Sequence, residues 1–252
     1  MPGLAPLLEL DGALARITLR RARLANRLEL GDLQTLRDQL DQINQREEVR
    51  VLLLAGEGRH FCSGFNITAV PGVDAAGLFE QLANAWEAAR PITIAKIQGG
   101  VYGGATDLAL ACDFRLGVSA CEMFVPAARL GLHFYQGGLE RYVTRLGVSW
   151  AKRILLAGQT LAAEDMLSSG FLDQLLPDSA ALELAGDALA ERLLAMAPLA
   201  LLGMKKHLNA FARGALDVSA LRSDIAVASA SQDLAEGVAA WREKRVPDFT
   251  GR

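Results

Sequence analysis

Two glycine-containing loops hold the residues best suited to chemistry. The first loop, Arg59 to Asn66, follows an apolar run at Val51 to Ala55, and the second, Gln98 to Gly104, follows one at Ile92 to Ile97. Small residues let the backbone approach a ligand closely, and N–H groups at a helix start have no partner within the helix. Two such donors that converge on one point can stabilise an oxyanion. The pattern alone also fits ordinary turns, because a glycine-rich turn by itself is a weak motif.

Composition and charge argue against several other classes of function. The chain carries 26 Lys and Arg against 29 Asp and Glu, a net charge of −3, with no long run of one sign, so we expect no nucleic-acid partner. We expect no membrane partner either, because the longest apolar runs are too short to cross a bilayer. The start of the chain does not resemble a signal peptide.

Cysteine and histidine usage argues against a disulfide-stabilised protein and against a metal-binding one. Cys62, Cys112 and Cys121 are odd in number and scattered, which argues against a disulfide framework and favours the cytoplasm. The three histidines are far apart and no Cys-x-x-Cys occurs, so the sequence predicts no metal site.

The elements that must position the two loops alternate between strand and helix. Leu7 to Leu10 and Leu14 to Leu19 flank Asp11-Gly12, which predicts a β-hairpin. Leu30 to Gln45 has apolar residues at helical spacing. The cycle repeats as far as about Val148, after which helical patterns dominate and strands nearly vanish. We therefore expect an α/β fold, with a core over residues 1–195 and a helical region over 196–252.

An ordered set of segments resembles the enoyl-CoA hydratase/isomerase (crotonase) superfamily. The similarity covers essentially the whole chain and is carried by Phe61 to Gly64, Gly99 to Asp113, Ala128 to Leu132, Pro198 to Lys206 and Glu243 to Phe249. The resemblance implies the ClpP/crotonase-like fold, with repeated ββα units in two roughly perpendicular sheets. It further implies a helical C-terminal region that assembles the chain into a homotrimer or a dimer of trimers.

The same resemblance implies a site for a coenzyme A thioester. The backbone N–H groups of Ser63 and Gly104 would stabilise a thioester enolate. No permanently bound cofactor is implied, because the CoA thioester is the substrate. The residues expected to contact it are Arg23, Leu24, Ala25, Cys62, Gly64, Phe65, Asn66 and Gly103.

In this family, the site of a hydratase resembles a pair of carboxylates. The present chain departs from that pattern at two positions. The first carboxylate position holds Asp107, and the second holds Ala127, which can neither take nor give a proton. Standard hydration is therefore doubtful. Asp107 could act as a base. Alternatively, it could simply be an aspartate in the first turn of a helix, where the helix dipole favours a negative charge.

Bulky polar residues in the next turn are further candidates for proton transfer. His133 and Tyr135 stand where the family commonly has small residues. Alternatively, His133 fixes the loop and Tyr135 caps the acyl pocket. Glu140 is either another acid or part of a solvated helix face.

The resemblance thus predicts an enzyme, a lyase or isomerase of the kind used in fatty acid metabolism. Hydratase, isomerase, hydrolase and decarboxylase remain open, although decarboxylation or a proton shift suits a site without the second carboxylate better. The alternative is a non-catalytic acyl-CoA-binding or assembly subunit with the same fold.

Overall fold

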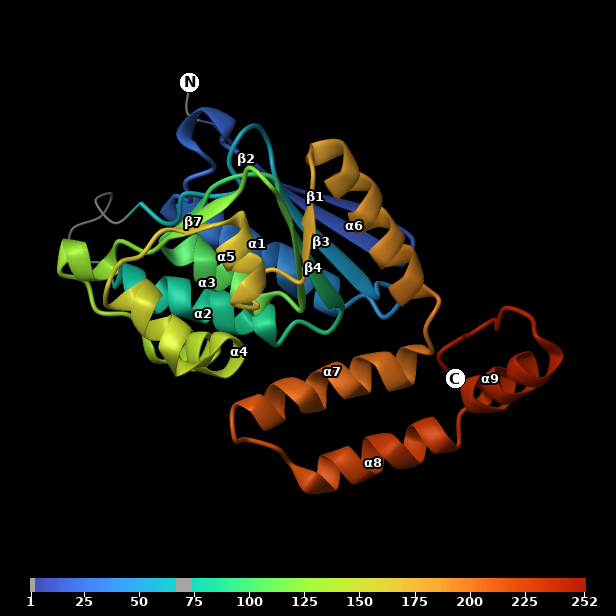
Figure 1. Ribbon diagram of the computed structural model, residues 1–252. Coiled ribbons are helices and arrows are strands. Elements are labelled where there is room, and N and C mark those ends of the chain that lie inside the picture. The colour runs from blue at the N-terminus through green and yellow to red at the C-terminus, as the bar shows by residue number, and fades with distance from the viewer. Residues whose placement is uncertain (1–2, 67–73) are drawn as a thin grey trace.

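The computed structural model describes residues 3–66 and 74–252. Its main sheet has six strands in the order β1-β2-β3-β4-β6-β9 (Figure 1). The first pair is antiparallel and the other four pairs are parallel. These strands are β1 (Leu4–Asp11), β2 (Leu14–Arg20), β3 (Val51–Gly56), β4 (Ile92–Ile97), β6 (Phe114–Val118) and β9 (Gln174–Leu176).

A smaller sheet of three short strands lies beside the main one, in the order β5-β7-β8. Its strands are β5 (Val101–Tyr102), β7 (Glu122–Phe124) and β8 (Leu161–Ala162). After β4 the chain leaves the main sheet and turns into β5, which lies within the second glycine loop. This loop therefore contributes a strand to the smaller sheet.

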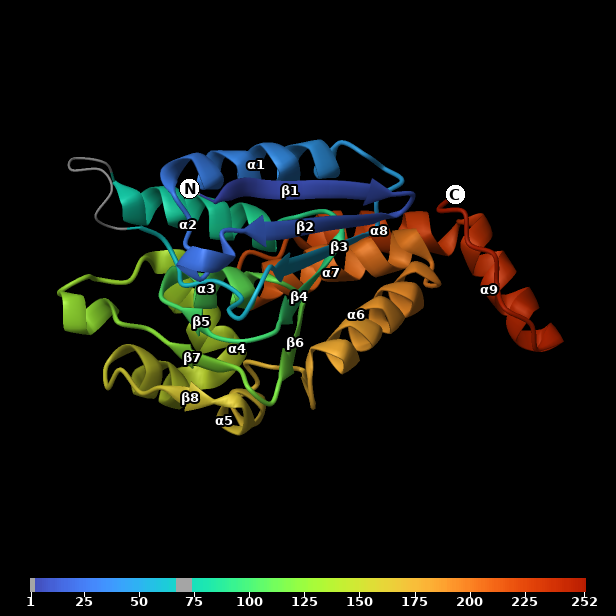
Figure 2. The same cartoon turned by 90° about the horizontal axis from the view of Figure 1, so that it is seen from above.

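Helices cover both faces of the main sheet, as Figure 2 shows. One layer holds α1 (Leu30–Asn44), α2 (Ala75–Glu87) and α3 (Gly104–Ala111), and α6 (Ser179–Leu194) packs on the opposite face. Burial on both faces explains why every residue of β4 is buried. The remaining core helices are α4 (Gln136–Leu155), α5 (Ala163–Ser168) and the 3-10 turns η1 (Ala22–Leu24) and η2 (Ala127–Leu130).

Three further helices form the C-terminal region: α7 (Pro198–Ala212), α8 (Val218–Ser229) and α9 (Gln232–Glu243). Figure 1 shows α7 and α8 beneath the core and α9 projecting to one side. The chain turns at Ala230, between α8 and α9. The hydroxyl of Ser231 then caps α9 by accepting a hydrogen bond from the N–H of Leu234 at 3.2 Å.

The predicted hairpin and the first helix are confirmed. Short strands after Val148 were not expected, and the structure adds β8 and β9 there. Both are only two or three residues long, so they carry no readable alternation.

The two glycine loops pack closely, so we expect any side chain at position 99 to lower the stability of the fold. A Cβ atom there would lie 1.9 Å from the carbonyl oxygen of Arg59, a backbone atom that cannot rotate away. We expect Gly99→Ala to lower the free energy of unfolding by about 1–3 kcal/mol, as overpacking does. Denaturant unfolding followed by circular dichroism measures this.

Gly31→Ala is the matched control, because a Cβ atom at this position of α1 meets nothing within 4 Å. Alanine favours a helix over glycine by up to about 1 kcal/mol, so this variant should be as stable as the parent or slightly more so. Equal unfolding midpoints for both variants would show that the loops are not packed against each other.

Candidate functional site

The two glycine loops meet at Gly64 and Gly104. A Cβ atom at Gly64 would lie 2.8 Å from the carbonyl oxygen of Tyr102 and 3.2 Å from the amide nitrogen of Gly104. Gly64 and Gly103 have φ values of +88° and +56°, which side chains rarely tolerate. Glycine is therefore required at this contact both for space and for backbone conformation.

The structure corrects the assignment of Ser63 as an oxyanion donor. Its N–H donates to the carbonyl oxygen of Ala25 at 2.8 Å, so this amide is already engaged. Its hydroxyl donates to the carbonyl oxygen of Leu24 at 3.3 Å. Ser63 thus fastens the first loop to the Leu24–Ala25 segment instead of facing the second loop.

In the first loop, the backbone N–H of Phe65, and not that of Ser63, is oriented so that it could act as a donor to a ligand. The N–H of Leu28 donates to the Gly64 carbonyl and the N–H of Asn66 donates to the Leu28 carbonyl, both at 2.9 Å. Successive peptide groups alternate in direction, so the N–H of Phe65 points away from Leu28. Within residues 3–66 and 74–252 it has no backbone acceptor.

Gly104 supplies a second unpaired amide. It is the first residue of α3, so its N–H has no partner within the helix, and the described residues offer it no other acceptor. The helix dipole adds positive potential at the same point. Phe65 and Gly104 are therefore the donor pair that this geometry supports.

Asp107, on the first turn of α3, is fully buried and fully engaged. Arg141 donates to both of its oxygens, from Nε to Oδ1 at 2.8 Å and from Nη2 to Oδ2 at 2.6 Å. The hydroxyl of Tyr135 donates to Oδ2 at 2.8 Å. A two-point guanidinium–carboxylate pair of this kind is among the strongest polar contacts in proteins.

Burial and charge keep the proton on Tyr135. Desolvation and then the negative charge of Asp107, which also accepts its hydrogen bond, raise the pKa of Tyr135 well above its usual value of 10. Burial lowers the pKa of Arg141, but the hydrogen bonds and attraction of Asp107 outweigh it and raise that pKa overall. At neutral pH Tyr135 is therefore a phenol and Arg141 a guanidinium.

Aromatic rings connect Tyr135 to the donor pair. A Cβ atom at Gly104 would lie 2.9 Å from the ring of Phe79, so that ring packs directly on the start of α3. The ring centroids of Phe79 and Tyr135 are 6.4 Å apart, those of Phe79 and Phe65 are 6.5 Å apart, and Phe134 stacks on Tyr135 at 4.8 Å. These contacts bring Tyr135, Phe65 and Gly104 to one apolar wall.

Other predicted site residues are not joined to Asp107. His133 is exposed, and its Nδ1 lies 2.7 Å from the carbonyl oxygen of Phe134. Glu140 is paired with Arg213 at 2.7 Å. Ala127 is half-buried in η2, with no group to transfer a proton. Arg23 is exposed at the end of η1.

Cys62 and Asn66 hold the first loop in place. The thiol of Cys62 lies 3.1 Å from the carbonyl oxygen of Asn26, and burial raises its pKa to about 12. The side chain of Asn66 donates to Glu29 at 2.9 Å. Cys62 is thus a packed structural residue, as a buried thiol usually is.

Sequence reasoning missed Arg141 and Phe79. Arg141 lies 34 residues after Asp107 on a helix that also carries exposed charges, so its spacing gave no signal. Phe79 matched a helical apolar pattern, which says only that a residue is buried and not what it covers.

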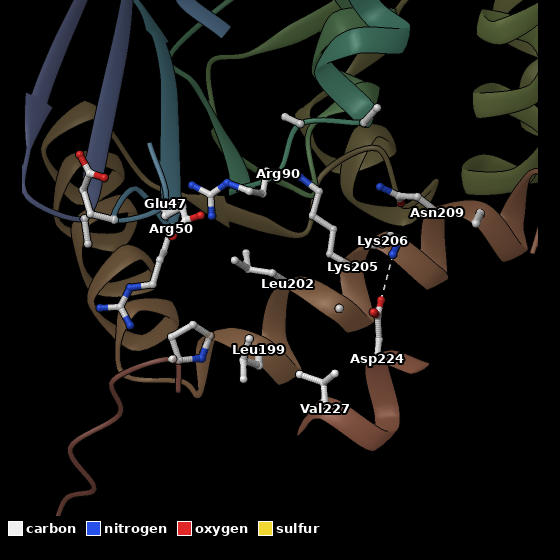
Figure 3. A pocket seen from close by; sticks show the side chains of 18 of the residues that line it. Glu47, Arg50, Arg90, Leu199, Leu202, Lys205, Lys206, Asn209, Asp224 and Val227 are labelled. Atoms are coloured by element: carbon white, nitrogen blue, oxygen red, sulfur yellow. Dashed lines mark hydrogen bonds and ion pairs between the residues drawn. The ribbon is translucent and has the colours of Figure 1, made fainter. Parts of the chain in front are cut away.

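A cavity of about 1390 Å³ lies away from this site, between the core and helices α7 and α8. Figure 3 shows Arg50 and Arg90 on its core side and Leu202, Lys205 and Lys206 along α7. Of the residues described, no group of histidine, cysteine and acidic side chains could hold a metal. No helix among them is long and apolar enough to cross a membrane.

Comparison with known proteins gives matches over nearly the whole chain. A family model described as enoyl-CoA hydratase/isomerase matches residues 9–252. A 2,3-dehydroadipyl-CoA hydratase of Escherichia coli is 28% identical over 94% of both chains. An enoyl-CoA isomerase/hydratase of Mycosarcoma maydis is 31% identical, covering 97% of this chain and 92% of that one. The crystal structure of an enoyl-CoA hydratase from Bacillus anthracis, 26% identical, superposes with a TM-score of 0.90 over 99% of this chain and 100% of that one.

The burial of Asp107 with Arg141 predicts a large loss of stability when one charge is removed. Asp107→Asn would leave a buried guanidinium without its main counter-charge, which typically costs about 3–5 kcal/mol. Urea unfolding should show this loss, and the double variant with Arg141→Gln should recover part of it.

Glu48→Gln provides the comparison, because it breaks an exposed pair with Arg46 at 3.5 Å. Exposed pairs contribute below about 1 kcal/mol, so this variant should unfold almost as the parent does. If both single variants cost the same, Asp107 is not held as described.

Proposed function

Because the chain belongs to the enoyl-CoA hydratase/isomerase family, we propose that this enzyme binds an acyl-CoA thioester with its carbonyl oxygen between the amides of Phe65 and Gly104. Negative charge that develops on that oxygen would meet two N–H donors and the positive end of α3. Each such donor typically lowers the barrier by roughly 2.7–4 kcal/mol. The supported intermediate is thus a thioester enolate, which is stabilised without any side-chain nucleophile.

One observation decides what happens to that enolate: both oxygens of Asp107 accept hydrogen bonds from Arg141. A general base needs a lone pair that can accept the proton, and its protonated form must be stable in its surroundings. Protonation of Asp107 would leave Arg141, which is 1% exposed, without its main counter-charge. With Ala127 at the other position, the site supports no carboxylate that could activate water for hydration.

Tyr135 is the group we assign to proton delivery. Its hydroxyl stays protonated because its pKa is raised, and its ring is part of the aromatic wall that reaches Gly104. A phenol in this state gives a proton to a carbanion more readily than it takes one from carbon. The favoured reaction therefore forms the enolate by breaking a bond that leaves its electron pair on the α-carbon.

Decarboxylation of a malonyl-type CoA thioester is such a reaction. The bond between the α-carbon and the carboxylate breaks, CO₂ leaves, and the electron pair passes into the enolate at the oxyanion site. The α-carbon then takes the proton of Tyr135, and water returns a proton to the phenolate. His133 and Glu140 are less suited, because the first is exposed and the second is paired with Arg213.

We expect purified protein to decarboxylate malonyl-CoA or a 2-alkylmalonyl-CoA and to hydrate crotonyl-CoA poorly. Tyr135→Phe should lower the decarboxylation kcat by roughly 10²–10⁴-fold, the usual contribution of a general acid. Product formation followed by mass spectrometry in D₂O would place one deuteron on the α-carbon.

His133→Asn is the control and should keep most of the activity. The kcat of the parent should not fall on the alkaline side below about pH 10, because the raised pKa keeps Tyr135 protonated there. Crotonyl-CoA hydration at the rate of an efficient hydratase would contradict the proposal. Tight acyl-CoA binding without turnover of any thioester would favour the alternative of a non-catalytic binding subunit.

We further propose that the C-terminal helices assemble the chain as a homotrimer or a dimer of trimers. They expose large apolar side chains that a lone chain would leave in water, among them Leu208 at 69%, Phe211 at 71% and Trp241 at 87%. Apolar patches of this kind mark protein interfaces.

Replacing Trp241 and Phe211 together by serine should shift the mass measured by sedimentation velocity from three or six chains toward one. Leu4→Ser, which changes an apolar residue exposed at 62% on the edge strand β1, should leave the mass unchanged. A parent protein that sediments as a monomer would contradict the assembly.

A further inference from the structure

A cluster of six charged side chains, Asp107 included, extends from the site to the C-terminal helical region. Asp107 pairs with Arg141, and Nη1 of Arg141 lies 3.3 Å from Glu87 at the end of α2. Glu87 also contacts Arg145 of α4 at 3.1 Å and Arg213 at the end of α7. Arg213 reaches Glu140 at 2.7 Å.

The charges of this cluster balance within it. Asp107, Glu87 and Glu140 carry three negative charges, and the three arginines carry three positive ones. The charged groups of Asp107, Glu87 and Arg141 are almost wholly buried, with side-chain exposures of 0%, 8% and 1%. Removing one outer charge therefore redistributes the hydrogen bonds of the inner groups, because water has little access to those groups.

Helix α7 presents one polar face to the core, and Arg213 is its last contact. Lys205, Asn209 and Arg213 follow at intervals of four residues, which places them on one side of the helix. Lys205 pairs with Asp113 at 2.7 Å, and the side chain of Asn209 donates to the Glu87 carbonyl at 3.0 Å. Docking of α7 therefore brings Arg213 against Glu87.

Glu87 contacts both Arg213 and Arg141, so it links the two ends of the cluster. Nε of Arg213 donates to Oε2 of Glu87 at 2.6 Å, and the same oxygen accepts from Arg141. Asn84 repeats this arrangement, since its Oδ1 accepts from Arg141 at 2.8 Å and from Arg213 at 3.3 Å. Without Arg213, both acceptors would turn to Arg141 and draw it away from Asp107.

We propose that Arg213 is a positioning residue for the reaction, acting through Glu87 and Arg141 to hold Asp107 and Tyr135 in place. The site is then complete only when α7 is docked on the core, which couples the C-terminal region to catalysis. Glu87 and Arg213 also line the cavity beneath α7, so the outer end of the cluster is open to that side of the molecule. This inference rests on the proposed function, because its readout is the rate at which Tyr135 delivers a proton.

The test compares Arg213→Gln with the parent and with Arg213→Lys in the decarboxylation assay. We expect Arg213→Gln to lower kcat by roughly 3- to 30-fold, the range for residues that act through a network. KM should change less than twofold, because Arg213 is far along the network from the thioester.

Lysine at position 213 keeps the charge but not the forked contact, so it should restore part of kcat. Arg222→Gln is the matched control, because Arg222 is an exposed arginine of the neighbouring helix α8 for which the described residues offer no carboxylate partner. It should leave kcat and KM unchanged.

Two failures can be told apart. A parent protein that turns over no thioester overturns the proposed function. A parent that is active, with Arg213→Gln matching it in kcat while its circular dichroism is native, overturns the coupling alone.

Discussion

The burial of Asp107 against Arg141 is the constraint on which the rest of the site depends. An ion taken out of water costs several kcal/mol unless partners satisfy it, and here two oxygens meet a two-point guanidinium and a phenol. This fixes the start of α3 against α4, and Glu87 extends the network to α2. The same contacts make protonation of Asp107 costly, because it would break up the buried pair with Arg141, so stability and chemistry are set by one interaction.

Backbone geometry, by contrast, defines the proposed oxyanion site. The start of α3 places the Gly104 amide, and the pairing of Gly64 and Asn66 with Leu28 turns the Phe65 amide toward it. Neither donor depends on its side chain, which leaves Phe65 and Phe79 free to form the apolar wall. Glycine is needed at position 64 because a Cβ atom there would meet the backbone of the second loop, and at position 104 because a Cβ atom there would meet the ring of Phe79.

The sequence was sufficient to predict features that are local. The Asp11-Gly12 hairpin and α1 follow from turn chemistry and helical spacing, and the glycine loops were located correctly. The assignment of Ser63 came from the resemblance; the direction of an amide depends on strand pairing, which sequence spacing does not reveal. Arg141 could not be matched with Asp107, since only the packing of α4 on α3 brings the two together.

The changes at the two carboxylate positions are consistent with each other. A site that activates water needs a carboxylate free to take a proton, and a buried aspartate with an arginine on both oxygens is not free. Alanine at position 127 removes the other acceptor, while Tyr135 retains its proton because burial and Asp107 both oppose ionisation. What remains is a donor of protons beside a stabiliser of enolates. Under the proposed function, such a site suits substrates whose own bond cleavage supplies the electron pair, because neither Asp107 nor Ala127 offers a base to release one from a C–H bond.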